Sequence, residues 1–230
     1  MGVDEMAKGK LNSLEEIFDL AVGNIKGQKG VITITIGGIP KVSSSNDIIG
    51  NCIQEWIPQW LEDNGLEMKE NPLSQQFPDF IATLDDKEYA MEVKCWNGKN
   101  SPAFDLANFD GFYRAVYENP KMLNAKYLIF SYEPTRHGFK ITNIFLKNIW
   151  EITSPSRNYP IGLQVKQGSP YAIRPFPFHK RPSSSFSSRR EFIKSIQATR
   201  KLFPLDSTIA PDKWLNGIEE RYKTLFGDEL

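Results

Sequence analysis

Three charged residues, Asp79, Glu92 and Lys94, are the first candidates for chemistry because they interrupt two short apolar runs. The runs, 77–84 and 89–95, are rich in Phe, Ile, Leu, Tyr, Met and Val, and a polar cluster separates them. Two such runs flanking a turn predict a β-hairpin. Charged side chains on strands of this kind are available for acid, base or metal chemistry.

The register of the hairpin decides whether the two acids meet. A two-residue turn at 85–86 places Leu84 opposite Lys87. Counting outward then places Asp79 directly opposite Glu92. Opposed residues of an antiparallel pair have Cβ atoms about 5 Å apart, and like charges there oppose folding. A divalent metal removes this repulsion, and Mg²⁺ typically takes one or two carboxylates and fills its shell with water and phosphate oxygens.

Lys94 shares the face of both acids. If burial and the metal lower its pKa, it can bind the attacked phosphate or help orient and deprotonate the attacking water. The pattern Pro78-Asp79, followed after twelve residues by Glu92-Val93-Lys94, resembles the signature of the PD-(D/E)XK nuclease superfamily. The resemblance implies that Asp79, Glu92 and the Val93 backbone carbonyl bind Mg²⁺, and that Lys94 assists phosphodiester hydrolysis. Because a Glu-x-Lys triplet is also a common solvated pair on exposed strands, the apolar flanks carry the interpretation.

Glu55 is a further candidate for the catalytic site. Capped by Ser45 or Asn46, a helix beginning at Asp47 places Ile49, Cys52, Ile53, Trp56 and Trp60 on one stripe, and Pro58 is expected to kink or divide it. Glu55 lies on the margin of that stripe, about 60° from Cys52. It resembles the additional Glu that many PD-(D/E)XK enzymes carry on a preceding helix. An exposed helical Glu is an equally good interpretation.

The chain of 230 residues is long enough for one large domain or two small ones, and we expect a single nuclease domain over 1–230. Basic and acidic residues number 28 each, so net charge gives no polyanion signal. Cys52 and Cys95 lack the spacing of a zinc site or disulfide framework and are expected to be small buried thiols. No apolar run approaches 18 residues and the N-terminus lacks an apolar core, so we expect a cytoplasmic protein without a membrane segment.

Periodicity predicts an α/β fold, with a mixed β-sheet flanked by helices. Helices are expected at 13–25, from 47 onward, 105–117, 146–150 and 189–201, and strands at 31–36, 77–84, 89–95, 126–132, 139–145, 161–166 and 171–175, the last as an edge strand. Residues 41–45 are expected to form a loop and 66–76 a polar approach to the hairpin. The succession 89–95, 105–117, 126–132 predicts a β-α-β unit with a right-handed crossover. This fold class matches the restriction-endonuclease-like core that the resemblance implies.

A basic segment spans residues 179–201. It contains seven Lys or Arg against the single acid Glu191, and a serine-rich loop precedes its helical part. Such residues commonly contact phosphate. The residues expected to bind DNA are Lys180, Arg181, Arg189, Arg190 and Lys194, together with Lys99 and Asn100 in the turn after Lys94. A solvated helix face with a flexible loop is the alternative. Neither His137 nor His179 is assigned a role.

Taken together, the chain resembles a type II restriction endonuclease. The stretches 49–56 and 76–80 are similar to the NgoBV- or SinI-like groups, which cut GC-rich palindromes. The resemblance implies a homodimer that cuts double-stranded DNA with Mg²⁺, and a cognate DNA methyltransferase as a genetic rather than physical partner. Two alternatives remain open here: a structure-specific repair or recombination nuclease of the same superfamily, and a non-catalytic DNA-binding protein.

Overall fold

The computed structural model describes residues 10–43, 45–70, 77–206 and 209–230. The chain forms two compact units whose segments are interleaved. Residues 1–100 and 126–146 make the first unit, and residues 101–125 and 147–230 make the second. The chain therefore passes from one unit to the other three times, and neither unit is one continuous segment.

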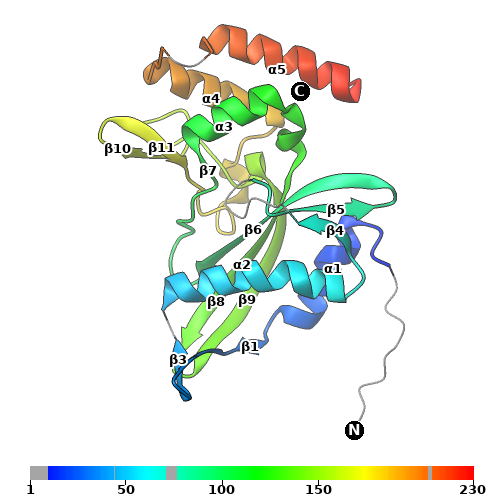
Figure 1. Ribbon diagram of the computed structural model, residues 1–230. Coiled ribbons are helices and arrows are strands. Elements are labelled where there is room, and N and C mark those ends of the chain that lie inside the picture. Colours follow the sequence, from blue (N-terminus) through cyan, green and yellow to red (C-terminus); the bar gives the residue numbers. More distant parts are fainter. Residues whose placement is uncertain (1–9, 44, 71–76, 207–208) are drawn as a thin grey trace. The chain divides into compact units, whose positions relative to one another are not determined.

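A six-stranded mixed sheet forms the centre of the first unit (Figure 1). Its strand order is β1 (Lys29–Gly30), β9 (Gly138–Asn148), β8 (Lys126–Thr135), β6 (Lys87–Asn97), β5 (Phe80–Leu84) and β4 (Glu67–Glu70). β6 and β8 pair in parallel, as the predicted crossover requires, whereas β4, β5 and β6 pair antiparallel in turn. β8 is buried over most of its length because it lies inside the sheet, as its continuous apolar run predicts.

Helices α1 (Leu14–Ile25) and α2 (Asn46–Asp63) supply the rest of this unit's core. Ser13 caps α1 by accepting a hydrogen bond from the Glu16 N–H at 3.1 Å, and the helix starts where the sequence predicts. α2 continues through Pro58, so of the two expected outcomes, a kink or a division, the division does not occur. The buried stripe of α2 consists of Ile49, Ile53, Ile57 and Leu61, and it packs with residues of β5, β6 and β8. Trp56, expected on this stripe, is 51% exposed.

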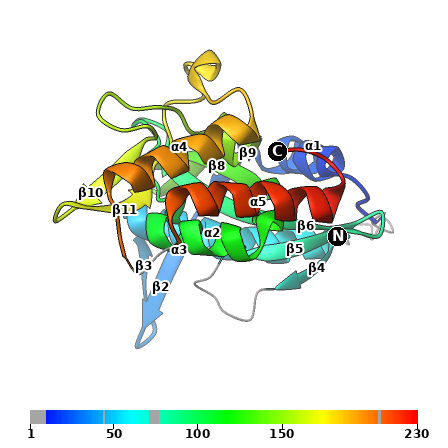
Figure 2. The same ribbon diagram turned by 90° about the horizontal axis from the view of Figure 1, so that it is seen from above.

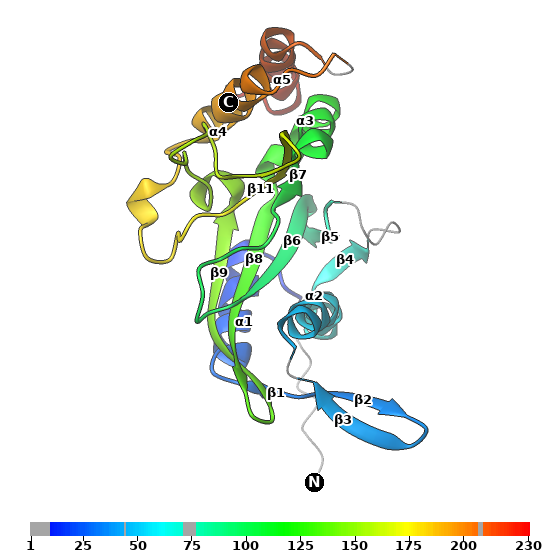
Figure 3. The same ribbon diagram turned by 90° about the vertical axis from the view of Figure 1, so that its left-hand side faces the viewer.

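Strands β2 (Ile32–Ile36) and β3 (Ile39–Ser43) form a separate two-stranded sheet. Figure 3 shows this hairpin extending away from the six-stranded sheet beside α2. Its turn is Gly37-Gly38, where both residues have positive φ (57° and 80°), as the tight turns of β-hairpins require. The loop expected at 41–45 is therefore corrected to a strand through Ser43, because this Gly-Gly turn reverses the chain immediately.

The second unit combines three helices with a three-stranded sheet. Helices α3 (Phe109–Glu118), α4 (Arg189–Leu202) and α5 (Pro211–Phe226) lie side by side in Figure 2. The sheet has the order β10 (Leu163–Lys166), β11 (Ser169–Ile173) and β7 (Ala107–Asn108), and short 3₁₀ turns are η1 (Pro120–Asn124), η2 (Ile149–Glu151) and η3 (Pro182–Ser184). β11 was expected at an edge, but it lies between two partners because β7 pairs with it from far back in the sequence.

The predicted mixed α/β fold is confirmed, with three further differences. The helix expected at 146–150 is corrected to the end of strand β9, through Asn148, followed by the 3₁₀ turn η2. The segment expected to be a polar approach to the hairpin, 66–76, contains strand β4, which pairs antiparallel with β5. The rest of that approach, 71–76, lies outside the described residues, and this includes the predicted similarity at Gln76. Both cysteines are free thiols and are only partly buried. No helix in the described part of the chain is long and apolar enough to cross a membrane.

Candidate active site

The predicted hairpin and its register are confirmed. β5 and β6 pair antiparallel with Leu84 opposite Lys87 at the turn and Phe80 opposite Met91 at the far end. The turn residues Asp85 and Asp86 both have positive φ (46° and 60°), which matches the twist of the two strands. The pair that follows Phe80 and Met91 outward is Asp79 and Glu92, so these two side chains come together.

One hydrogen bond joins the two acids, and a second joins Asp79 to the backbone of Val93. The Asp79 backbone N–H donates to Oε2 of Glu92 at 3.2 Å, and the Val93 N–H donates to Oδ2 of Asp79 at 2.6 Å. Lys94 completes the group, since its Nζ lies 2.6 Å from Oε1 of Glu92. The side chains of Glu92 and Lys94 are only 7% and 15% exposed. The three predicted residues therefore form one partly buried cluster at the end of β5.

Burial shifts both carboxyl groups toward their protonated forms. The pKa of Glu92 is raised to about 7. Burial is the main cause and the negative charge of Asp79 adds to it, while the positive charge of Lys94 opposes the shift. The pKa of Asp79 is raised by burial too, although the Val93 N–H and Lys94 favour its charged form. Two acids that resist ionisation side by side form a site where a proton or a cation is bound favourably.

The donor set fits a small divalent cation. Asp79 and Glu92 offer carboxylate oxygens, and the Val93 carbonyl offers a backbone oxygen next to them. Among the described residues no three His, Cys, Asp or Glu side chains form a metal cluster. An ion held here therefore takes two protein carboxylates and completes its shell with water and substrate oxygens, which is the usual arrangement for Mg²⁺.

Gln54 is a site residue that the sequence reasoning missed. Its Nε2 donates to the Val93 carbonyl at 2.6 Å. The contact belongs to a regular series between α2 and β6, which also joins Asn46 to Asn97 (3.2 Å) and brings Gly50 against Cys95, where a Cβ on the glycine would lie 4.0 Å away. The contacts fall every four residues on the helix and every two on the strand, since four helical residues rise about 6.0 Å and two strand residues about 6.6 Å.

The structure does not bring Glu55 to the cluster. α2 packs on the face of β6 that carries Met91 and Val93, whereas Glu92 and Lys94 alternate to the other face. Gln54 reaches the site because a backbone carbonyl lies in the plane of the sheet. Glu55, one residue further along α2, is exposed. The helix predicted to supply a carboxylate thus supplies an amide instead.

Tyr127 is the second site residue that the sequence did not reveal. It pairs with Glu92 across the parallel β6–β8 ladder, so both side chains leave the same face. Its buried hydroxyl has no hydrogen-bond partner among the described residues. Burial raises the pKa of Tyr127 well above its ordinary value, and the charges of Glu92 and Asp79 raise it further. A neutral phenol with an unused donor therefore adjoins the two acids.

Lys99 and Asn100, expected to contact DNA, lie in the exposed turn that follows β6. The turn is held by the Lys99 N–H, which donates to Oδ1 of Asn97 at 3.1 Å, and by the Asn100 N–H, which donates to the Asn97 carbonyl at 3.0 Å. Both side chains belong to the same unit as the acidic cluster and leave the chain five or six residues after Lys94.

Much of the basic segment 179–201 is engaged within the second unit. Arg189 lies between the rings of Trp150 and Tyr222, with its guanidinium carbon 4.9 and 4.7 Å from their centroids. Arg190 pairs with Glu219 at 3.2 Å. Further contacts are made by Arg200, which is 2% exposed and bonds Asp110, and by Lys201, which pairs with Asp212 at 2.7 Å.

Four residues of the predicted DNA-binding set are exposed in this segment, and three of them, Lys180, Arg181 and Lys194, make no ion pair among the described residues, unlike Arg190. Lys180 and Arg181 precede the 3₁₀ turn η3, and Lys194 lies on the exposed side of α4 between the buried Ile193 and Ser195. These side chains are the ones that can meet a polyanion without losing an internal contact.

A mixed sheet whose central hairpin carries two adjoining carboxylates and a lysine defines a nuclease of the PD-(D/E)XK class. Comparison with known proteins then gives the family. A sequence model of the NgoBV restriction endonuclease family matches residues 11–230, so the chain belongs to this family and is a type II restriction endonuclease. The predicted resemblance to the NgoBV-like group is confirmed.

Individual relatives agree with this placement. The chain is 32% identical over 216 residues to the type II restriction enzyme NlaIV of Neisseria lactamica, covering 91% of this chain and 88% of that protein. It is 27% identical over 157 residues to the type II restriction enzyme NgoBV of Neisseria gonorrhoeae, covering 66% and 89%. The solved structure of the NlaIV restriction endonuclease superposes with a TM-score of 0.84 at 29% identity, over 96% of this chain and 94% of that one.

Proposed function

We propose that the enzyme hydrolyses phosphodiester bonds of double-stranded DNA at a short GC-rich palindrome, in a reaction that requires Mg²⁺, and that Asp79, Glu92 and Lys94 carry the chemistry. The observation that carries this proposal is the buried cluster on one hairpin, in which the Glu92 carboxylate accepts from the Asp79 backbone N–H and pairs with Lys94. The GC-rich palindrome rests on the resemblance to the NgoBV-like group.

The chain's own residues have separate tasks in this proposal. Asp79, Glu92 and the Val93 carbonyl would hold the cation. When bound, Mg²⁺ lowers the pKa of the attacking water and neutralises charge that develops on the phosphate. Lys94 orients the water or holds the attacked phosphate, since its ammonium group already lies in the cluster. Glu92 must lose its proton before it can serve as a ligand.

The two neighbours on α2 contribute unequally. Gln54 orients the peptide that links Val93 to Lys94, because it bonds the Val93 carbonyl, while Asp79 accepts from the Val93 N–H of the preceding peptide. A carbonyl oxygen has two lone pairs, so this bond leaves one for a cation. For Glu55, exposed beside it, we propose at most a contact through water.

DNA binding is proposed for Lys99, Asn100, Lys180, Arg181 and Lys194. Arg189 and Arg190 are proposed to contribute less, because their guanidinium groups already have partners within the protein.

A palindrome read by two identical subunits favours a homodimer, each copy cutting one strand. We propose further that both units act as one nuclease domain, since the chain crosses between them three times. The enzyme would act in the cytoplasm, with a cognate DNA methyltransferase as its genetic rather than physical partner.

Digestion of phage DNA with the purified protein tests the proposal. We expect discrete, reproducible bands in the presence of Mg²⁺ and none with EDTA. Sequencing the fragment ends then gives the recognition site, which we expect to be a GC-rich palindrome. A smear, cleavage confined to junctions, or binding without cleavage under any divalent metal contradicts the proposal.

A further inference from the structure

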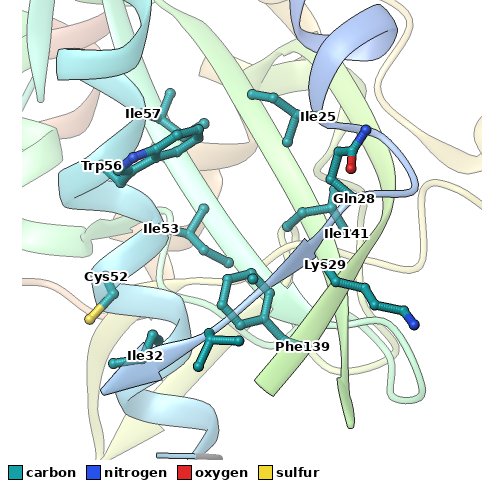
Figure 4. Close-up of a pocket in the computed structure, with 12 residues that line it drawn as sticks. Ile25, Gln28, Lys29, Ile32, Cys52, Ile53, Trp56, Ile57, Phe139 and Ile141 are labelled. Carbon is teal, nitrogen blue, oxygen red and sulfur yellow. The ribbon is translucent and has the colours of Figure 1, made fainter. Parts of the chain in front are cut away.

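The six-stranded sheet has one apolar face and one face that carries the acidic cluster. α2 packs on the apolar face, and on that side a pocket of about 390 Å³ is bordered by α2 and β9 (Figure 4). Ile53 of α2 and Phe139 of β9 belong to its lining, and none of the described residues that line it is Asp or Glu. The opposite face carries Glu92, Lys94 and Tyr127, because side chains alternate along β6 and β8. The carboxylates that could hold a cation therefore lie on the second face, together with a tyrosine.

Tyr127 lies directly beside Glu92 on this face. The two residues are partners in the parallel β6–β8 ladder, so their side chains leave neighbouring strands at the same level. The Tyr127 ring also contacts the ring of Phe77, with centroids 6.4 Å apart. Phe77 leads into β5, and β6 lies between β5 and β8, so this contact indicates that the phenol leans across the strand that carries Glu92. Burial raises the pKa of Tyr127, and the charges of Glu92 and Asp79 raise it further, which agrees with this direction.

The hydroxyl of Tyr127 is a buried donor without a partner. It makes no hydrogen bond to any described residue, although its oxygen is shielded from solvent. A buried polar group left unpaired costs free energy, and such groups are rare in native proteins. Phenylalanine would fill nearly the same space without this cost. The hydroxyl is explained if an acceptor becomes available to it when the site is loaded.

The Glu92 carboxylate has room for such a hydrogen bond. In the structure its Oε2 accepts from the Asp79 N–H at 3.2 Å, and its Oε1 lies 2.6 Å from Nζ of Lys94. An ionised carboxylate offers about four lone-pair positions, so about two remain, one for a cation and one for a further donor. Hydrogen bonds in active sites are often long or poorly aligned in the free enzyme and tighten only in the reacting complex. Tyr127 is the neighbouring donor that can take the remaining position.

We propose that Tyr127 is a positioning residue of the cation site, and that its hydroxyl donates a hydrogen bond to the ionised Glu92 carboxylate when a divalent cation is bound. The bond limits the rotation of the carboxylate and stabilises its charged form. Partners of this kind orient the residues that bind a metal and strengthen the binding. The inference rests on the cation site proposed above and adds a residue to it.

Titration of the full-length protein with Mn²⁺, followed by electron paramagnetic resonance, tests the proposal without catalysis. Tyr127→Phe removes only the hydroxyl, and we expect its dissociation constant for Mn²⁺ to rise about tenfold, as for other partners of metal ligands. The matched control is Tyr132→Phe, on the same strand but on the apolar face, where the hydroxyl donates to the Asn46 carbonyl at 2.8 Å. The control should bind Mn²⁺ within about twofold of the wild type, because its hydroxyl lies on the far side of the sheet.

Urea unfolding in EDTA separates positioning from a structural role. Tyr127→Phe removes an unpaired buried group, so its unfolding midpoint should equal or exceed that of the wild type. Tyr132→Phe loses a hydrogen bond and should unfold at a lower urea concentration. Cleavage gives a third measurement: in Tyr127→Phe the Mg²⁺ concentration for half-maximal activity should rise about tenfold, while the rate at saturating Mg²⁺ falls less than about threefold.

An unchanged Mn²⁺ affinity for Tyr127→Phe overturns the proposal, and so does a loss of affinity that Tyr132→Phe shares in full. Asp79→Ala then shows which hypothesis has failed. If Asp79→Ala abolishes Mn²⁺ binding while Tyr127→Phe binds normally, the cation site stands and only the role of Tyr127 is refuted. If Asp79→Ala binds Mn²⁺ as tightly as the wild type, the cation site itself is refuted, and the role of Tyr127 with it.

Discussion

The hairpin around Asp79 and the basic segment 179–201 both present charged residues, but the structure uses them in opposite ways. In the hairpin, few charges are buried and bonded to one another, so each is available for one task. The basic segment has many charged residues, but several of them make internal contacts. Arg189 lies between two aromatic rings, and Arg200 bonds Asp110. The spacing of charges therefore predicted which of them the structure brings together, whereas their number did not.

The largest effect on cleavage is expected from substitutions in the hairpin cluster. Asp79→Ala or Lys94→Ala should reduce cleavage at least about 1,000-fold, because a metal ligand or the cation beside the water is lost. Glu88→Gln, at an exposed position of the same strand, is the matched control and should cut at the wild-type rate. Single-turnover rates and gel-shift binding in Ca²⁺ measure both effects. Near-normal cleavage by either alanine variant would remove that residue from the site.

The basic segment is tested next through Arg200. Arg200→Ala should destabilise the protein by about 3 kcal/mol, since it leaves Asp110 without its buried partner. Lys201→Ala breaks only the exposed pair with Asp212 and should cost less than about 1 kcal/mol. Urea unfolding measures the difference. Equal stabilities for the two variants would show that Arg200 does not have this structural role.

A third prediction concerns competition between a proton and Mg²⁺ for the Glu92 carboxylate in the hairpin. With the pKa of Glu92 raised to about 7, cleavage at limiting Mg²⁺ should fall about tenfold per pH unit below 7. The midpoint should move to lower pH as Mg²⁺ increases, because the ion displaces the proton. A rate independent of pH between about 5 and 8 at limiting metal contradicts this expectation.

The same shift affects the stability of the metal-free protein. Between the ordinary carboxyl pKa of 4.5 and the raised value of about 7, the folded state holds more protons than the unfolded state. The contribution of Glu92 to stability is therefore largest below 4.5 and is lost as pH rises through about 7. Denaturation in EDTA across this range, compared with the variant Glu92→Gln, isolates the effect.

Removal of the exposed cations is expected to have a smaller effect. Replacing Lys180, Arg181 and Lys194 together by Ala should weaken DNA binding about tenfold and lower the salt dependence by up to about three charges, since each phosphate contact releases a counterion. The matched triple variant of Lys140, Lys213 and Lys223, also exposed, should bind as the wild type does. An unchanged salt slope for the first variant would place the DNA surface elsewhere.

The smallest effect is expected at Gln54. Gln54→Ala should lower the cleavage rate severalfold and raise the Mg²⁺ concentration needed for half-maximal activity, because the Val93 carbonyl loses the donor that orients it. Gln54→Glu replaces that donor with an acceptor, and at neutral pH should be more damaging than the alanine. Direct Mn²⁺ titration by electron paramagnetic resonance provides a readout besides activity. Identical metal affinity in all three proteins would make Gln54 merely structural.

The sequence predicted contacts that form over short stretches of chain. The register of Asp79 and Glu92 followed from the two turn residues 85–86, and the helix at 13–25 followed from its cap and periodicity. Gln54 and Tyr127 were missed because their approach to the cluster depends on how α2 and β8 pack on β6, which no local pattern encodes. For the same reason the fate of Arg200 was hidden, since its partner Asp110 lies in a different helix.

Contacts between α2 and β6 recur every four residues along the helix and every two along the strand. This matched spacing restricts how this part of the chain can change in length. Inserting one residue between Asn46 and Gln54 turns everything beyond it by about 100° and carries the amide away from the strand. Replacing side chains on the outer surface leaves the phase intact. We therefore expect α2 to tolerate changes of residue type at its exposed positions far better than insertions or deletions.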